Sequence, residues 1–276
     1  MNVAVIGRGL IGGSVEKAAR RAGHDVRIFA GRGPSPDVSG ADVVVVATPL
    51  SAVVPAVEAL AAGGTLKDGA AVVDIAGVKS PVCAALSKYA AGRWRFVGGH
   101  PMAGKERTGY ANSCESLFDG ASMILVPYPQ TPEETMRSLS EFFLSLGFGR
   151  VVRTTPERHD EMISFTSQLC HLMSSAYVRD RLAPLHSGYS AGSFRDMVRV
   201  GAPDPAVWTE LFLANAKPLA GVLGRYIARL EDFKSAIEAG DARSLAAMLD
   251  EGVAAKAALA AATAAAADPR KKETAT

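Results

Sequence analysis

The sequence predicts an α/β protein whose N-terminal part is a doubly wound parallel sheet and whose C-terminal part is a second, all-helical domain. Up to residue 154, short apolar runs alternate with helical stretches, an order typical of parallel βαβ units. Beyond residue 155 the strand-like runs stop and long helical patterns take over. We therefore place a domain boundary between residues 1–154 and residues 155–276.

Seven apolar runs are the expected strands, and four stretches with helical periodicity lie between them. Short loops and right-handed crossovers between these elements make a doubly wound sheet. The expected strands are 3–6, 26–29, 43–47, 71–75, 96–98, 123–126 and 149–154, and the expected helices are 14–22, 52–61, 81–90 and 132–146.

Three long helical patterns, 157–181, 206–239 and 241–267, make up the second domain. Asp204-Pro205 precedes the second pattern, and Gly240-Asp241 places a glycine stop directly before an N-cap aspartate. A helical domain of this size that cannot enclose a core by itself often pairs with its own copy. We therefore expect a homodimer formed through the helical domain.

The overall composition narrows the classes of partner. The 276 residues are 48% hydrophobic and 21% charged, which is ordinary for a soluble globular protein. The net charge of +2 gives no reason to expect nucleic acid or a membrane as partner. Since a strand is expected from the first residues, no leader precedes it and we expect a cytoplasmic protein. Three cysteines without metal-ligand spacing predict reduced thiols, no disulfide and no metal site.

A glycine-rich run, Gly7-Arg8-Gly9-Leu10-Ile11-Gly12, directly follows the first expected strand and opens a helix. The first glycine permits a tight turn, the second lets the backbone approach a pyrophosphate, and the third lets helix and strand pack closely. Amide groups at the helix start then face the phosphates. The run predicts a Rossmann-type dinucleotide site that these six residues line.

The end of the second expected strand indicates the cofactor. Phe29-Ala30-Gly31-Arg32 contains no carboxylate for the ribose hydroxyl of NAD, whereas the Arg32 guanidinium can bind a 2′-phosphate. NADP is therefore favoured over NAD, and the alternative for Arg32 is a solvated loop arginine. Thr48 and Pro49, after the third strand, and Lys79, close to the expected nicotinamide, complete the predicted cofactor contacts.

A histidine follows the fifth expected strand. His100 stands in Gly98-Gly99-His100-Pro101-Met102-Ala103-Gly104, at the carboxyl end of a strand, where open parallel sheets place their reacting groups. A titratable ring at this edge, together with a dinucleotide site, predicts an enzyme that transfers hydride.

Six motifs in this order resemble the prephenate/arogenate dehydrogenase family, over residues 1 to about 240 and in both domains. They are the Gly7–Gly12 turn, Asp74–Lys79, Gly99–Glu106, Arg158–Asp160, Ser167–His171 and Ser193–Arg199. The resemblance implies oxidative decarboxylation of prephenate to 4-hydroxyphenylpyruvate, in tyrosine biosynthesis. Such an enzyme holds the C4 hydrogen against the nicotinamide, draws off the C4 hydroxyl proton and anchors a dianionic substrate.

The resemblance also implies roles for single residues. His100 matches the family histidine at the C4 hydroxyl and is the expected general base. His171 matches a second histidine in the substrate pocket, and Trp208 a nearby tryptophan. Arg199 matches the arginine that holds a substrate carboxylate, with Arg195 assisting.

The remaining expected substrate contacts have weaker motifs. Lys105 and Glu106 follow the His100 loop and are expected at the pocket edge, while His159 orders the domain junction or the pocket wall. Gly77 stands where many family members have a serine, and Cys170 where a proline is common. Because Gly77 has no hydroxyl group, the sequence does not determine the path by which the proton leaves the substrate.

Three alternatives compete with this prediction. Arogenate dehydrogenase uses the same chemistry on a substrate with an ammonium group, and the sequence does not separate the two. A β-hydroxyacid dehydrogenase or imine reductase would rely on a lysine or another group of the helical domain. A non-catalytic regulator would bind NADP without turning over a substrate.

Overall fold

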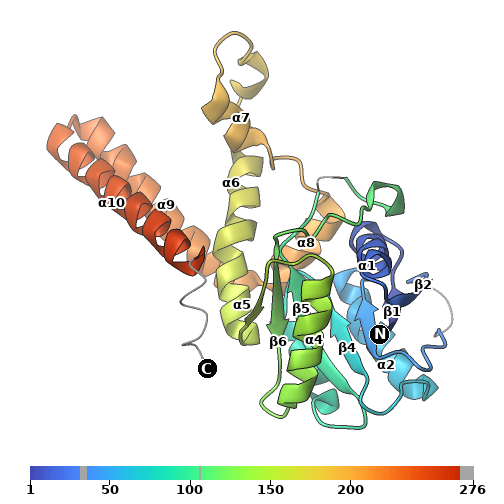
Figure 1. Cartoon of the computed structure of the whole chain (residues 1–276). Helices are drawn as coiled ribbons and strands as arrows, with labels where there is room; N and C mark the ends of the chain where they lie inside the picture. The colour runs from blue at the N-terminus through green and yellow to red at the C-terminus, as the bar shows by residue number, and fades with distance from the viewer. Residues whose placement is uncertain (32–35, 106, 268–276) are drawn as a thin grey trace. The chain divides into compact units, whose positions relative to one another are not determined.

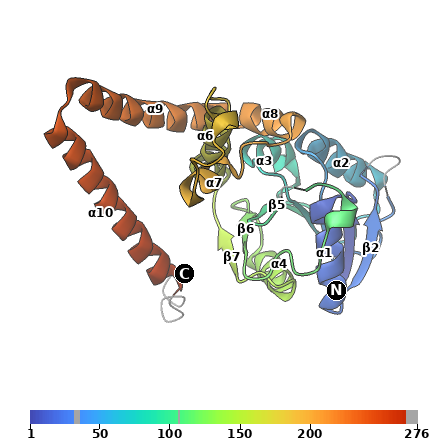
Figure 2. The same cartoon turned by 90° about the horizontal axis from the view of Figure 1, so that it is seen from above.

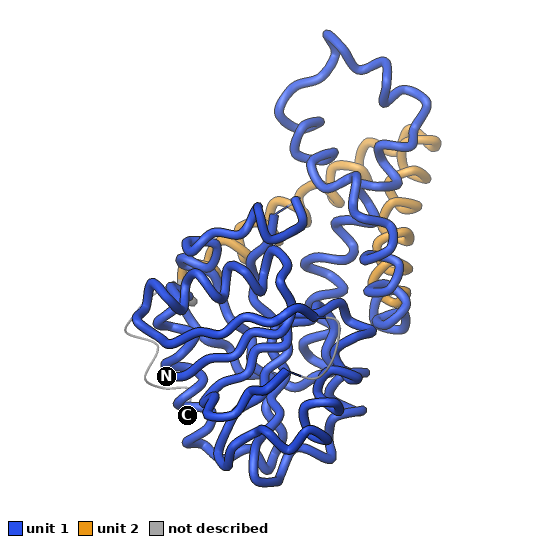
Figure 3. The backbone as a smooth tube through the Cα atoms, turned by 90° about the vertical axis from the view of Figure 1, so that its right-hand side faces the viewer, with its two compact units in different colours: residues 1–219 blue, residues 220–276 orange. Residues whose placement is uncertain are grey.

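A computed structural model of the chain describes residues 1–31, 36–105 and 107–267 (Figure 1). The chain forms two compact units, residues 1–219 and 220–276 (Figure 3). The first unit contains a seven-stranded sheet with helices on both faces and the helical segments as far as residue 219. The second contains most of one long helix and all of another.

The sheet has the strand order β2-β1-β3-β4-β5-β6-β7. The first five strands are parallel, β6 is antiparallel to β5, and β7 is parallel to β6. The strands are β1 (Asn2–Ile6), β2 (Asp25–Phe29), β3 (Val43–Val46), β4 (Ala71–Asp74), β5 (Arg95–Pro101), β6 (Ser122–Val126) and β7 (Arg150–Arg153).

The predicted doubly wound parallel sheet is confirmed for the first five strands, but β6 and β7 run in the opposite direction to them. A parallel neighbour requires a crossover connection, usually a helix. In the described parts of the connection from β5 to β6, the only helical turn is the short 3-10 segment Tyr110–Asn112, and β6 pairs beside β5 in the opposite direction. A crossover helix does join β6 to β7, and these two strands are parallel.

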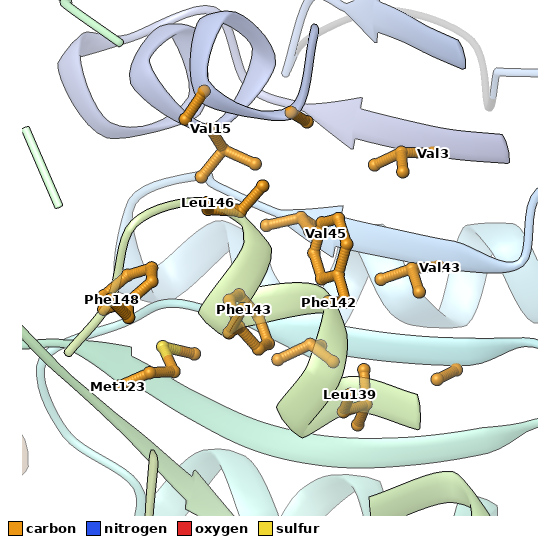
Figure 4. Packing of buried hydrophobic residues seen from close by; sticks show 14 of the residues in the cluster. Val3, Val15, Val43, Val45, Met123, Leu139, Phe142, Phe143, Leu146 and Phe148 are labelled. Carbon is orange, nitrogen blue, oxygen red and sulfur yellow. The ribbon is translucent and has the colours of Figure 1, made fainter. Parts of the chain in front are cut away.

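Alternation along the strands places side chains on both faces of the sheet, as Val3 and Val5 join one core cluster and Ala4 and Ile6 the other. Helices α1 and α4 cover the first face and α2 and α3 the second (Figure 2). Figure 4 shows the first cluster, where Phe142 and Phe143 pack against Val45 and Met123. The covering helices are α1 (Leu10–Arg21), α2 (Leu50–Gly63), α3 (Ser80–Leu86) and α4 (Glu133–Ser145).

The first long helical pattern is interrupted by a π-helical segment, Ser164–Gln168, and the second is divided at Asn215. π-Helical turns shift the following side chains around the helix axis and are frequent at functional sites. Helix α7 was not expected from the sequence. The observed helices are α5 (Pro156–Ile163), α6 (Leu169–Tyr177), α7 (Gly192–Val198), α8 (Pro205–Ala214), α9 (Ala216–Ala239) and α10 (Ala242–Ala267).

The second unit consists of α9 from residue 220 and of α10. Six of its large apolar side chains are between 45% and 70% exposed: Ile227, Leu230, Ile237, Leu249, Val253 and Leu259. In the described part of the chain, no helix combines the length and the apolar character needed to cross a membrane.

At Gly99 the backbone of β5 lies close to the neighbouring strand β4. A Cβ atom at Gly99 would lie 2.4 Å from the Asp74 carbonyl oxygen and 2.6 Å from Val73 Cγ1. Since real Cβ atoms do not approach a backbone oxygen this closely, only glycine fits between β4 and β6 here.

We expect Gly99→Ala to destabilise the protein by about 1–3 kcal/mol, because the added methyl overpacks a position bounded by backbone. Urea unfolding of both proteins measures the difference. Gly104→Ala is the matched control, since a Cβ at Gly104 meets no described atom within 4 Å. A Gly99→Ala protein as stable as the control would contradict the steric argument.

Candidate active site

The glycine-rich loop after β1 packs tightly on one side and is open on the other. Gly7 has a φ of +114°, and a Cβ there would lie 2.2 Å from the Ala47 carbonyl oxygen. A Cβ at Gly12 would lie 2.0 Å from the Gly7 carbonyl oxygen, whereas one at Gly9 would meet no described atom within 4 Å. The loop therefore leaves room for a ligand above Gly9.

The polar groups beside this loop fit a dinucleotide. Helix α1 begins at Leu10 with Gly9 as N-cap, and the described residues provide neither a side-chain cap nor a first-turn carboxylate there. Its first amides can therefore bind a pyrophosphate. Thr48 Oγ1 is buried without a hydrogen-bond partner among the described residues, a condition that a bound ligand relieves. The geometry suits the predicted contacts of Gly7, Gly9, Gly12 and Thr48.

A tyrosine that the sequence did not single out covers the start of α1. The Arg8 guanidinium lies 4.6 Å from the centre of the Tyr110 ring, and the Tyr110 hydroxyl donates to Glu16 Oε2 at 2.9 Å. A Cβ at Gly13 would lie 2.6 Å from the ring. Tyr110 thus orients Arg8 beside the loop, and no local pattern could have predicted this contact, because 102 residues separate the two along the chain.

Two of the predicted contacts lie outside the described residues. Arg32, expected to bind a 2′-phosphate, is one, and Glu106, expected at the pocket edge, is the other. Both therefore remain predictions.

A cavity of about 540 Å³ opens beside His100 in the first unit, and we call it the His100 cavity. Aromatic and aliphatic groups line it, together with hydroxyl and amide groups. Its lining residues are Gly77, His100, Pro101, Met102, Ala103, Gly104, Ile163, Thr166, Ser167, Gln168, His171, Trp208 and Leu211.

His100 lies within β5, not beyond its end as the sequence suggested. Its Nδ1 lies 2.9 Å from Nε2 of His159, and His159 Nδ1 lies 2.7 Å from Asp160 Oδ1. Burial, with contributions from His159 and Lys79, holds the pKa of His100 well below its ordinary value of 6.5. At neutral pH the ring is therefore uncharged and able to accept a proton.

Lys79 occupies a different place from the one predicted. Its side chain has no exposed surface and forms an ion pair with the equally buried Asp74, and its Nζ donates to the Gly99 carbonyl oxygen at 2.7 Å. Asp74 also accepts from the Gly99 amide at 3.1 Å. The Lys79 ammonium therefore links β4 to β5 beside His100. Because it is fully buried, it cannot contact a cofactor.

His171 and Trp208, both predicted to be substrate contacts, form one wall of the His100 cavity. Their ring centres are 3.7 Å apart, and His171 Nδ1 donates to the Val200 carbonyl oxygen at 3.2 Å. This hydrogen bond connects the wall to the segment that follows α7.

The structure does not bring the predicted cations into this cavity. Arg195 lies on α7 and Arg199 at its end, and both side chains are exposed. Lys105 Nζ lies 3.2 Å from Cys114 Sγ. Among the described residues that line the cavity, none is a lysine or an arginine. Arg199 is nevertheless next in sequence to Val200, which holds His171.

Sequence reasoning missed three polar residues that organise the cavity. Asp160 stood in a quoted motif without a role. Asn215 Nδ2 donates to the Asp160 carbonyl oxygen at 2.9 Å and to Gln168 Oε1 at 2.7 Å, and Gln168 Nε2 donates to the Leu211 carbonyl oxygen at 3.2 Å. For Asn215 and Gln168, the signal in the sequence was a polar amide side chain within an apolar helical stretch.

We expect Lys79→Met to lower the free energy of unfolding by about 3–5 kcal/mol, because it leaves the Asp74 carboxylate buried without its cation. Urea unfolding provides the measurement. Lys88→Met is the control, since the pair of Lys88 with Glu58 is 57% and 45% exposed and contributes at most about 1 kcal/mol. Equal losses in the two variants would contradict a structural role for the buried pair.

In the comparison with known protein families, each of the two parts of the chain matches one family. The family described as "Prephenate dehydrogenase, nucleotide-binding domain" matches residues 4–152. The family described as "Prephenate dehydrogenase, dimerization domain" matches residues 155–251.

Two individual relatives are named cyclohexadienyl dehydrogenase and prephenate dehydrogenase. The chain is 30% identical to a cyclohexadienyl dehydrogenase of Zymomonas mobilis, over 87% of this chain and 89% of that one. It is 29% identical to a Bacillus subtilis prephenate dehydrogenase, over 75% of this chain but only 57% of the length of that relative.

Two solved structures are similar in fold, each at 25% identity and 94% coverage of this chain. One is a prephenate dehydrogenase from A. aeolicus in complex with hydroxyphenyl propionate and NAD⁺, with a TM-score of 0.80 and 98% of that chain covered. The other is an arogenate dehydrogenase from Synechocystis, with a TM-score of 0.79 and 100% of that chain covered. Since family matches span both parts of the sequence, the chain belongs to the prephenate dehydrogenase family.

Proposed function

We propose that this protein is a prephenate dehydrogenase, which oxidises and decarboxylates prephenate to 4-hydroxyphenylpyruvate in tyrosine biosynthesis. The observation that carries the proposal is His100, an uncharged histidine held by His159 in the wall of a 540 Å³ cavity. His100 stands at the carboxyl end of β5 and the glycine-rich loop at that of β1, and these parallel strands belong to one sheet. A base and a dinucleotide site at one sheet edge suit hydride transfer.

The reaction needs a proton acceptor at the ring alcohol. When bound, the nicotinamide supplies the acceptor for the hydride that leaves C4. His100 takes the C4 hydroxyl proton as the C4–O bond becomes a carbonyl. The ring carboxylate then leaves as carbon dioxide, and its bonding electrons complete the aromatic ring. The phenolate oxygen that results takes the proton back from His100. The chain therefore has to supply one positioned base and hold the substrate in place.

The walls of the His100 cavity suit a small cyclic acid. Trp208, Leu211 and Met102 offer apolar surface for a ring, and Ser167 offers a hydroxyl group. We assign His171 to the substrate wall, as in the sequence-based prediction.

A dianionic substrate also requires cations. We assign the carboxylate contact to Arg199, with Arg195 assisting, because the Arg199 backbone directly precedes the residue that binds His171. A guanidinium can bind a carboxylate through two parallel hydrogen bonds. Lys105 and Glu106 remain proposed contacts at the cavity edge.

For the cofactor we propose NADP in preference to NAD. The loop carries Arg8, which Tyr110 orients, and the end of β2 continues into Ala30-Gly31-Arg32 without a carboxylate. Guanidinium groups favour a 2′-phosphate over a ribose hydroxyl. The NAD⁺ in the A. aeolicus complex supports a nicotinamide dinucleotide of either kind.

We further propose a homodimer formed through residues 155–276, the substrate-binding and dimerisation part, beside the dinucleotide-binding part at 1–154. The exposed apolar side chains of α9 and α10 support this assembly, as does the dimerization-domain match at 155–251. Large apolar side chains in such numbers on two helices are typical of an interface. The cytoplasmic location stays a prediction.

The direct test is a steady-state assay of the purified protein with prephenate and with arogenate, each with NAD and with NADP. We expect turnover of prephenate, and higher kcat/KM with NADP than with NAD. His100→Gln should lower kcat by about 10²–10⁴-fold, because the reaction loses its general base.

Each other outcome has a definite meaning. Higher kcat/KM for arogenate would assign the amino substrate. Cofactor binding without turnover of either acid would indicate a non-catalytic regulator. Full activity of His100→Gln would contradict the proposed base.

The lowered pKa of His100 predicts the pH dependence. Since only the neutral ring accepts a proton, kcat/KM should be constant above the His100 pKa and fall as the pH drops through it. Because that pKa lies well below 6.5, activity should still be on its plateau at pH 6.5. Rates and circular dichroism measured between about pH 5 and pH 8 would separate this titration from unfolding. An acid limb centred above pH 6.5 would contradict the burial argument.

A further inference from the structure

We propose that His159 and Asp160 are positioning residues that fix the tautomer of His100, so that its Nε2 is the nitrogen that accepts the substrate proton. The inference deepens the proposed function and rests on it. We call the chain of contacts from Asp160 through His159 to His100 the relay. The direction of each hydrogen bond in the relay follows from the atoms that can only accept hydrogen bonds.

The relay begins at an ionised carboxylate. Asp160 Oδ1 accepts from the Lys79 amide at 2.8 Å and Oδ2 from the Ser80 amide at 2.7 Å. Burial opposes ionisation of Asp160, but hydrogen bonds from His159, Ser80 and Lys79 outweigh it and lower the pKa of the carboxyl group. A carboxylate only accepts hydrogen bonds. His159 Nδ1, 2.7 Å from Oδ1, must therefore carry a hydrogen.

The second step crosses to the other ring. A neutral imidazole has one N–H, so with Nδ1 protonated the Nε2 of His159 is an acceptor. It lies 2.9 Å from His100 Nδ1, which must then donate. In a neutral His100 this leaves Nε2 without a hydrogen. Since His159 is only 1% exposed, Nδ1 of His100 faces the interior, and Nε2 is the nitrogen available to the cavity.

The relay also serves the protonated state. When Nε2 takes the hydroxyl proton, His100 becomes an imidazolium whose Nδ1–H still donates to His159. The Asp160 charge then lies at the far end of two hydrogen bonds and stabilises the imidazolium without accepting a proton itself. One proton moves from substrate to His100, and no bond changes within His159 or Asp160.

Residue 77 cannot replace this support. Gly77 has no side chain to donate to His100, and a Cβ built there would lie 3.9 Å from His100 Cε1 and 3.2 Å from Leu211 Cδ2. Side-chain control of the His100 ring therefore comes from the His159 side.

The first test is nitrogen NMR of ¹⁵N-labelled imidazoles in the full-length protein without substrate, with His100→Gln to assign the signals. We expect a protonated Nδ1 and an unprotonated Nε2 on His100 near neutral pH. The reverse assignment would overturn the relay. This readout does not depend on turnover, so it tests the relay even if the protein proves inactive with prephenate.

The second test compares His159→Gln with His159→Leu. The glutamine amide oxygen can still accept from His100 Nδ1, whereas leucine cannot, so we expect kcat to fall by about 10²–10⁴-fold in the leucine variant and by about tenfold in the glutamine variant. The KM for prephenate should change less than kcat in both. A residue with only a packing role predicts the opposite order, because leucine suits a buried position better than glutamine.

Two controls complete the design. His24→Leu makes the same change at a histidine that bonds Met1 and Ser145, away from the cavity, and should leave kcat unchanged. Thermal unfolding of each variant corrects for loss of folded protein. Equal activity of the two His159 variants, both folded, would overturn the relay, whereas an inactive wild type would overturn only the proposed function.

Discussion

The Asp160 carboxylate is the group on which the rest of the site depends. It comes from α5, yet its two oxygens accept from the first amides of α3, at Lys79 and Ser80. The same carboxylate orients His159 and, through it, His100. Helix α3 has no side-chain cap from its own N-cap residue, so one charge both completes the start of that helix and, through His159, orients the His100 ring. Loss of this carboxylate would disturb fold and chemistry together.

A buried ion pair, Asp74 with Lys79, holds β5 beside His100. The Asp74 carboxylate and the Lys79 ammonium bind the Gly99 amide and carbonyl, one residue before the histidine. Lys79 thus offers its backbone amide to Asp160 and its ammonium to Asp74. Buried charges are tolerated when they are paired and fully hydrogen bonded. Together the two carboxylates hold the Gly99 backbone and, through His159, the His100 ring from separate elements.

The sequence predicted the elements of the sheet, the glycine loop and His100, because each depends on local periodicity or spacing. It did not predict the direction of β6, since an apolar run carries no sign of its direction and the connection before it decides the pairing. Lys79 follows a strand and therefore resembled a ligand contact, although only the folded structure shows its burial against Asp74. Tyr110 and Asn215 act through partners far away in sequence, which no local pattern encodes.

The proposed function assigns chemistry and substrate selection to different parts of the first unit. His100, His159 and Asp160 stand on a strand and a helix that pack into the interior, where rigid neighbours fix the ring. Of the predicted anchors, Arg195 stands on the short helix α7 and Arg199 directly after it. The next residue, Val200, accepts a hydrogen bond from His171 in the cavity wall. Under that assignment, substitutions in α7 change which side chain of the substrate is accepted without changing the protonation of His100. If the proposed roles hold, specificity for a keto or an amino acid depends on the segment around α7, while the oxidation itself depends on the relay.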